Sequence, residues 1–120
     1  TRRHQLGKRY YELLTDLPII LPYRNPANYS GFHLYPIQLT ADSGKTRKQV
    51  FDSLRAQNIG VNVHYIPVHT QPYYAKLGFR QGDFPHAERY YAQAISLPLY
   101  YDLSEASQAQ VVNAIYQALA

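Results

Sequence analysis

The residues best suited to chemistry in this chain lie in one short segment, where histidines and tyrosines surround a proline-rich turn. His64, Tyr65, His69 and Tyr73 fall within ten consecutive positions, and two prolines separate them. Neutral imidazole and phenol groups donate and accept hydrogen bonds, and proline restricts the backbone that carries them. This combination favours a site that binds a polar ligand such as a sugar or a phosphate.

Two other interpretations of the histidines stay open. A metal site would use His64 and His69 together with His86 or Glu88, although the spacing of the first two matches no common zinc pattern. Alternatively, both imidazoles are packing residues whose nitrogen atoms are satisfied inside the fold. The chain has no cysteine, which excludes disulfides, thiolate metal sites and cysteine nucleophiles. We therefore expect no metal centre.

Other catalytic signatures are missing from the sequence. It contains no GxGxxG motif and no P-loop, so no glycine-rich phosphate loop is predicted. Ser96 and Ser104 lack the glycine-flanked turn that exposes a nucleophilic serine. The eight carboxylates include no close pair suited to acid–base catalysis. The sequence thus assigns no catalytic residue.

The composition indicates one ordinary globular domain. The 120 residues are 46% hydrophobic and 17% charged, which argues against disorder. The net charge is +4, but the basic residues are spread along the chain and form no stripe of the kind that nucleic-acid binders carry. No apolar run approaches the length of a membrane helix, and no signal peptide is visible, so we expect a cytoplasmic protein that binds neither nucleic acid nor membranes. Methionine is absent even from position 1, and no cap precedes the first helix, which predicts a carboxy-terminal fragment of a longer protein.

Apolar residues at helical spacing predict four helices, and turn-forming residues separate them from short strands. A capping box at Thr46 and Gln49 begins the second helix, and Pro36 should confine its strand to a sheet edge or a bulge. This mixed order predicts an α+β fold, with a small, mostly antiparallel sheet and helices on one face. The expected order is helix 1–16, strand 19–21, strand 32–39, helix 46–58, strand 59–63, a long loop 64–82, helix 83–94, strand 95–99 and helix 104–119.

Five sequence blocks carry further information together. They are Val61–His69, Pro72–Tyr74, Leu77–Phe79, Asp83–Glu88 and Ile95–Tyr100. In this order and with these gaps they resemble the carboxy-terminal part of the DegT/DnrJ/StrS family of sugar aminotransferases, and the resemblance covers nearly the whole chain. The first block is most similar to the pseudaminic acid pathway members, the transaminases that form UDP-4-amino-4,6-dideoxy-N-acetyl-β-L-altrosamine.

The resemblance implies that residues 1–120 are the C-terminal small domain of the aspartate-aminotransferase fold. In such enzymes glutamate donates an amino group, by way of pyridoxal phosphate, to C4 of a nucleotide-linked keto-sugar, here a UDP-4-keto-6-deoxy sugar. The family's Schiff-base lysine lies upstream, in the larger domain, and none of the four lysines of this chain has the matching context. The resemblance therefore implies a fragment that is inactive alone and a full-length enzyme that is a homodimer.

The resemblance also implies roles for the residues named at the outset. His64 and Tyr65 would stand at the mouth of the active site and face the nucleotide sugar. His69 and Tyr73 would be supporting or lid residues, and Glu88 would brace the loop. The alternative is a standalone module that binds a carbohydrate or a protein partner through a surface rich in tyrosine, which occurs 13 times.

Overall fold

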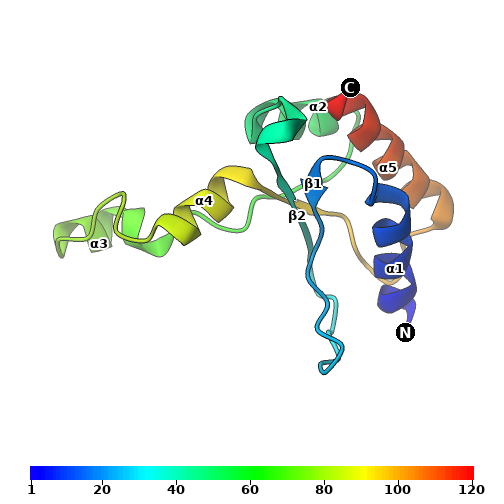
Figure 1. Cartoon of the computed structure of the whole chain (residues 1–120), viewed down its shortest axis with the longest axis horizontal. Coiled ribbons are helices and arrows are strands. Elements are labelled where there is room, and N and C mark those ends of the chain that lie inside the picture. The colour runs from blue at the N-terminus through cyan, green and yellow to red at the C-terminus, as the bar shows by residue number, and fades with distance from the viewer.

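The computed structural model describes all 120 residues, and Figure 1 shows helices gathered around a small sheet, with two segments that project from it. The α-helices are α1 (Arg2–Leu14), α2 (Arg47–Ala56), α3 (Pro72–Lys76), α4 (Pro85–Gln93) and α5 (Glu105–Leu119). The strands are β1 (Ile19–Ile20), β2 (Tyr35–Leu39) and β3 (Ala94–Leu97), and single 3₁₀ turns are η1 (Ala41–Ser43) and η2 (Val68–Thr70). The predicted α+β fold class is confirmed.

The sheet is antiparallel throughout and has the order β1-β2-β3. β2 pairs with β3 along its length, from Tyr35 opposite Leu97 to Gln38 opposite Ala94. β1 reaches only the end of β2, where Ile19 lies opposite Leu39. The longest strand pairing therefore joins two parts of the chain that are far apart in the sequence.

Pro36 lies in the central strand, so the prediction that it would keep β2 at an edge or a bulge was wrong. The reason lies in the hydrogen-bond pattern of the residue opposite, Ser96. The backbone N–H and C=O of Ser96 both bond to Asn62 on the far side of β3, so Pro36 and Ser96 form a non-hydrogen-bonded pair. The Pro36 nitrogen thus points away from β3, toward the side of β2 where β1 lies. β1 has only two residues and pairs with Gln38 and Leu39, so it does not reach Pro36 and no hydrogen bond of the sheet is lost.

The strand predicted over residues 59–63 shrinks to a single bridge between Asn62 and Ser96. Ile59 and Val61 are buried, as the apolar pattern indicated, but the chain leaves β3 after the bridge. The predicted long loop that follows contains η2 and the short helix α3. The hydrophobic pattern therefore predicted which residues of this segment are buried. It did not predict the length of the strand, which depends on where the segment separates from β3.

Helices α1, α2 and α5 lie together on one side of the sheet (Figure 1), and α5 contacts both of the others. The core beneath them is a cluster of 18 buried residues, among which Tyr10, Leu54, Ile95 and Ile115 are fully enclosed. Each such side chain stabilises the fold by roughly 1.5–3 kcal/mol through the apolar surface it buries. The predicted placement of helices on one face is confirmed for these three.

Local sequence signals fix where two of these helices begin. The predicted capping box is present: Gln49 N donates to Thr46 Oγ1 at 3.2 Å, and Thr46 N donates to Gln49 Oε1 at 2.9 Å. Ser104 caps α5 by accepting a hydrogen bond from the backbone N–H of Ser107 at 3.0 Å. Caps of this kind typically stabilise a helix by about 1 kcal/mol.

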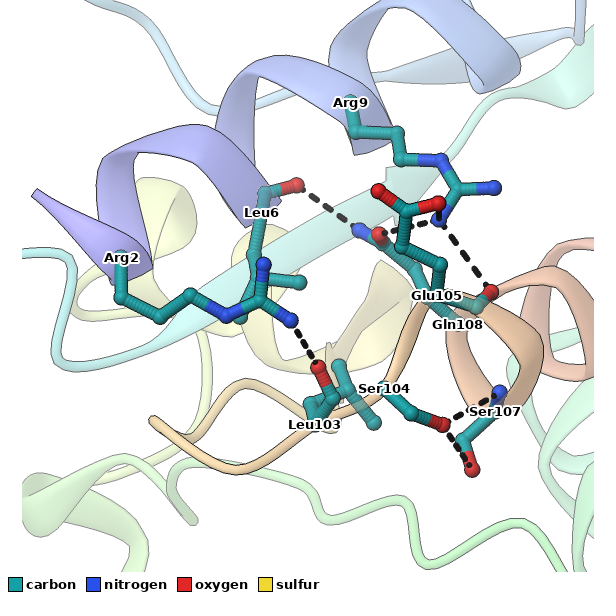
Figure 2. Close-up of polar contacts among 8 residues, drawn as sticks. All are labelled: Arg2, Leu6, Arg9, Leu103, Ser104, Glu105, Ser107 and Gln108. Carbon is teal, nitrogen blue, oxygen red and sulfur yellow. Dashed lines mark hydrogen bonds and ion pairs between the residues drawn. The ribbon is translucent and has the colours of Figure 1, made fainter.

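A polar clasp joins the first helix to the last (Figure 2). Gln108, on α5, is fully buried, and its Nε2 donates to the Leu6 carbonyl oxygen of α1 at 2.8 Å. Its Oε1 lies 3.5 Å from Arg9 Nη1, and Arg2 Nη2 donates to the Leu103 carbonyl at 2.6 Å. The clasp therefore holds α1 against both α5 and the turn that precedes α5.

Two segments project from this body and bury little (Figure 1). One is the loop 21–34, and the other is residues 65–93, which we call the arm. Helices α3 and α4, both in the arm, contain no buried residue. The large apolar side chains that the arm leaves exposed are Tyr65, Ile66, Val68, Tyr73, Leu77, Phe79 and Phe84. None of the helices is long and apolar enough to cross a membrane.

We predict that Gln108→Ala destabilises the chain by about 1–3 kcal/mol, because the buried hydrogen bond between α1 and α5 is lost and the missing amide leaves a cavity. Gln117→Ala is the matched control, since Gln117 is exposed on the same helix and should change stability by less than about 0.5 kcal/mol. Urea unfolding followed by circular dichroism measures both. Equal midpoints for the two variants would contradict the role of the clasp.

We also predict that stability falls as the pH rises above about 10. Tyr10 is buried and donates to the Pro98 carbonyl at 2.7 Å, and this burial raises the pKa of its phenol. Burial also raises the pKa of Tyr35 to about 12. Unfolded tyrosines ionise near pH 10. The stabilisation is therefore complete below that pH and is lost as the pH rises toward the folded pKa values.

The check is the urea midpoint between pH 8 and pH 11.5. Tyr10→Phe should show a shallower alkaline loss, whereas Tyr23→Phe, at a residue that is 86% exposed, should follow the unmodified chain. A Tyr10→Phe curve parallel to that of the unmodified chain would show that this phenol does not set the alkaline limit.

Candidate binding site around His64

A hollow of about 490 Å³ opens beside His64, and we call it the His64 hollow. Its walls come from the chain before β2, the segment after α2, the end of β3 and the beginning of α5. Every side chain that lines it is uncharged at neutral pH when histidine is counted as neutral. Such walls suit a neutral, hydroxylated ligand better than a phosphate. The polar lining residues are His33, Asn58, Asn62, His64, Ser96, Tyr100, Ser107 and Gln110.

Strand β3 positions His64 through its neighbour Asn62. Asn62 N donates to the Ser96 carbonyl at 3.2 Å, and Ser96 N donates to the Asn62 carbonyl at 2.8 Å. Val61, just before this bridge, is fully buried in the core. The backbone is therefore fixed on β3 two residues before His64, and the imidazole is held at the root of the arm.

Ser96 contacts the imidazole of His64 directly. Its Oγ lies 2.8 Å from His64 Nδ1, and the serine is 6% exposed while the histidine is half-buried. Sequence reasoning considered Ser96 only as a nucleophile and missed this contact. A signal was available, because Ser96 is the one polar residue in a strand whose four residues are all buried. A buried hydroxyl in such a strand requires a hydrogen-bond partner.

Tyr65 lies beside His64, as its place in the sequence suggests. The two rings meet edge to face, with centroids 4.6 Å apart and an angle of 72° between planes. Tyr65 is 73% exposed. Its phenol is therefore available to a ligand or to another protein surface that covers this end of the arm.

His69 and Tyr73 lie farther along the arm. His69 is 7% exposed, packs its ring against Phe84 with centroids 4.8 Å apart, and places Nε2 3.4 Å from Glu88 Oε1. Those two atoms do not align as a hydrogen bond. Tyr73 is 67% exposed and packs edge to face on Tyr74. The structure thus places Tyr65 next to His64, and the aromatic contacts of the other two predicted site residues lie within the arm.

Glu88 braces the arm from inside. Its Oε1 accepts a hydrogen bond from the backbone N–H of Gly82 at 2.7 Å, and its side chain is 17% exposed. The same oxygen is the one nearest to His69. Glu88 therefore ties the turn before α4 to α4 itself and lies close to His69 of η2, and its geometry is that of a support.

A larger hollow, of about 1220 Å³, lies elsewhere, between α1 and the loop 21–34. None of the predicted site residues lines it. His4 stacks on Tyr29 with ring centroids 4.2 Å apart, and Arg24 lies over the ring of Phe32 at 5.3 Å. The contact of His4 holds the loop against α1, whereas that of Arg24 lies within the loop.

The profile of one protein family, described as the DegT/DnrJ/EryC1/StrS aminotransferase family, matches residues 1–116. The chain belongs to this family. A curated relative, the spore coat polysaccharide biosynthesis protein SpsC of Bacillus subtilis, is 36% identical over 118 residues, which are 95% of this chain and 30% of that protein. The chain therefore spans about a third of the length of such relatives.

Solved structures of aminotransferases share the fold. S. venezuelae DesV has a TM-score of 0.87 and 31% identity, over 98% of this chain and 31% of that one. Helicobacter pylori PseC, described as an aminotransferase involved in the biosynthesis of pseudoaminic acid, has a TM-score of 0.85 and 26% identity over 98% of this chain and 32% of that one. The predicted resemblance to sugar aminotransferases is confirmed.

The residues of this chain do not fit pyridoxal phosphate. A lysine that forms a Schiff base is typically desolvated beside its cofactor. All four lysines here are exposed, and two of them pair with surface carboxylates: Lys8 with Glu12 and Lys48 with Asp52. No group of three or more histidine, aspartate or glutamate side chains is placed to hold a metal ion. We therefore assign no step through either group to these residues.

We predict that the 120-residue chain, mixed with pyridoxal phosphate, gives no stoichiometric absorbance band that glutamate removes, because each lysine faces water. Borohydride reduction followed by peptide mass spectrometry is the measurement. Partial labelling spread over Lys8, Lys45, Lys48 and Lys76 is expected. Complete labelling of a single lysine would show that the chain holds a cofactor site of its own.

Proposed function

We propose that residues 1–120 are the C-terminal domain of a pyridoxal-phosphate-dependent nucleotide-sugar aminotransferase. The complete enzyme would transfer an amino group from glutamate to C4 of a UDP-4-keto-6-deoxy sugar, in surface-glycan biosynthesis of the pseudaminic acid type. Family membership supports the reaction class. PseC, an aminotransferase involved in the biosynthesis of pseudoaminic acid, and SpsC, a spore coat polysaccharide biosynthesis protein, support this substrate class.

The observation that carries the proposal is the uncharged, polar lining of the His64 hollow. A sugar presents hydroxyl and carbonyl groups that exchange hydrogen bonds with imidazole, amide and hydroxyl side chains. Apolar residues such as Leu97 and Leu103 complete the walls and exclude water from those bonds. The hollow has the chemistry of sugar recognition and lacks a charged group that would hold a diphosphate.

In this proposal the four predicted site residues have different tasks. His64 donates a hydrogen bond to the sugar, and Tyr65 covers the ligand from the root of the arm. His69 supports the arm from within, against Phe84 and Glu88, and Tyr73 lies on the outside of α3 as part of a lid. Pyridoxal phosphate would supply the electron sink for amino transfer and would be held by the rest of a cytoplasmic enzyme.

The arm favours assembly with further protein. Helices this short are marginal in water unless they pack on something, yet α3 and α4 bury no residue in this chain. We propose that the remainder of the enzyme and a second copy of it cover the arm in a homodimer. Exposed tyrosines also support the alternative, a standalone carbohydrate- or protein-binding module, since Tyr101 and Tyr65 are 69% and 73% exposed.

The test is His64→Ala in the complete enzyme that contains this chain. We expect kcat/KM for the keto-sugar to fall about 5- to 150-fold, the equivalent of about 1–3 kcal/mol for a lost polar contact, while the KM for glutamate stays unchanged. Gln117→Ala is the control, because Gln117 is exposed near the end of α5, outside both the arm and the His64 hollow, and should leave both constants unaltered.

Two outcomes would count against the proposal. Normal keto-sugar kinetics in a folded His64→Ala enzyme would remove His64 from the binding site. A complete protein without transaminase activity, whose 120-residue domain binds neutral glycans in calorimetry, would favour the standalone module.

A further inference from the structure

We propose that Ser96 is a positioning residue that fixes the proton of His64 on Nε2, so that the imidazole presents a hydrogen-bond donor to the ligand. This inference rests on the proposed function, in which His64 contacts the sugar. It starts from the contact between the two side chains: Ser96 Oγ lies 2.8 Å from His64 Nδ1.

The hydroxyl of Ser96 is held in a fixed position, because the backbone of Ser96 is hydrogen-bonded to Asn62 and its side chain is buried. Both backbone groups of Ser96 bond to Asn62, at 2.8 and 3.2 Å. The strand around it is buried along its whole length, and Ser96 itself is 6% exposed. The hydroxyl oxygen therefore stays at one place relative to the backbone that carries His64.

The direction of the hydrogen bond follows from the number of acceptors. A serine hydroxyl has one hydrogen to donate, and a buried donor without an acceptor is costly. The contact with His64 Nδ1 is the only hydrogen bond that Ser96 Oγ makes within the chain. The hydroxyl therefore donates to Nδ1, and a neutral imidazole that accepts at Nδ1 carries its proton on Nε2.

The lining of the hollow contains no charged group that would move the His64 proton to the other ring nitrogen. No carboxylate and no lysine or arginine lines it, and the other titratable groups there are His33 and Tyr100. Without a nearby charge to pull the proton to the other nitrogen, the serine hydroxyl decides the tautomer. His64 then acts as a donor to a carbonyl or hydroxyl oxygen of the sugar and does not act as a base.

This assignment gives the hollow a specificity. A ligand that places an acceptor oxygen opposite Nε2 gains a hydrogen bond, and one that places only a donor or a methyl group there leaves a polar N–H unpaired. The substrate class that fits is a neutral sugar whose ring substituents include a carbonyl or hydroxyl oxygen at that point.

The kinetic test uses the complete enzyme and four variants. Ser96→Ala removes the hydroxyl and Ser96→Cys keeps a side chain of similar size that donates poorly, so both should raise the KM for the keto-sugar about tenfold with little change in kcat. Ser96→Thr restores the hydroxyl and should recover the unmodified KM. Ser43→Ala is the matched control, since Ser43 is also buried, at 8% exposure, and its Oγ donates to the Lys45 carbonyl just after η1.

A double variant separates this proposal from the function on which it rests. If Ser96 acts through His64, the Ser96→Ala change should cost nothing further in an enzyme that already carries His64→Ala. No kinetic effect of His64→Ala would defeat the proposed function. A loss with His64→Ala but none with Ser96→Ala, or additive losses, would defeat the positioning role alone.

A spectroscopic readout addresses the proton itself. In the 120-residue chain labelled with ¹⁵N-histidine, the two ring nitrogens of His64 should show the shifts of a protonated Nε2 and an unprotonated Nδ1. Ser96→Ala should convert this to a mixture of tautomers, and Ser96→Thr should not. A His64 that carries its proton on Nδ1 in the unmodified chain would overturn the proposal.

Discussion

The hydrogen bond from Gln108 to the Leu6 carbonyl is the contact on which the arrangement of this domain depends. The two residues belong to the last and the first helix, and the amide is fully buried between them. A buried polar group of this kind favours a single packing, because a shift of α1 along α5 would leave the buried amide N–H of Gln108 without its acceptor. Arg2 extends the same clasp to the Leu103 carbonyl, and Leu103 is also a wall of the His64 hollow. The first and last helices therefore help to position one wall of the His64 hollow.

The second constraint is the position of β3 between two very different neighbours. On one side it pairs with β2, and on the other it meets only Asn62. This single bridge holds the segment that leads to His64, and the chain then leaves the body as the arm (Figure 1). One buried strand thus supplies both the rigid support, Ser96, and the point from which the exposed part of the site departs.

Four of the five α-helices were predictable from the sequence because their signals are local, whereas the short helix α3 falls in the predicted loop. The capping box of Thr46 and Gln49 formed as expected, and apolar spacing located α1, α2 and α5. Contacts between strands that are far apart in the sequence were not predictable. Pro36 is tolerated in the central strand only because Ser96, opposite it, directs its backbone hydrogen bonds to Asn62, on the other side of β3. The same pairing brings Ser96 to His64, so the serine was visible in the sequence only as a polar residue in an apolar strand. Nearness in sequence was also a poor guide to the arm, where His69 turns inward and Tyr73 outward.

The distribution of charge bears on how the proposed enzyme would divide its work between this chain and the remainder of the protein. The walls of the His64 hollow carry no charged side chain, whereas the exposed lysines pair with carboxylates or face water. A basic pair, Arg47 and Lys48, lies at the start of α2 and lines a separate hollow of about 510 Å³. Transfer of an amino group requires a cofactor and a group that moves protons, and diphosphate binding requires cations. The His64 hollow is lined by no charged side chain, and its donors and acceptors are uncharged. Under the proposed function, these groups would discriminate between sugars without competing for the proton that the reaction moves. Under the proposed function, a domain built in this way would contribute to which substrate reacts, and the chemistry would belong to residues elsewhere in the enzyme.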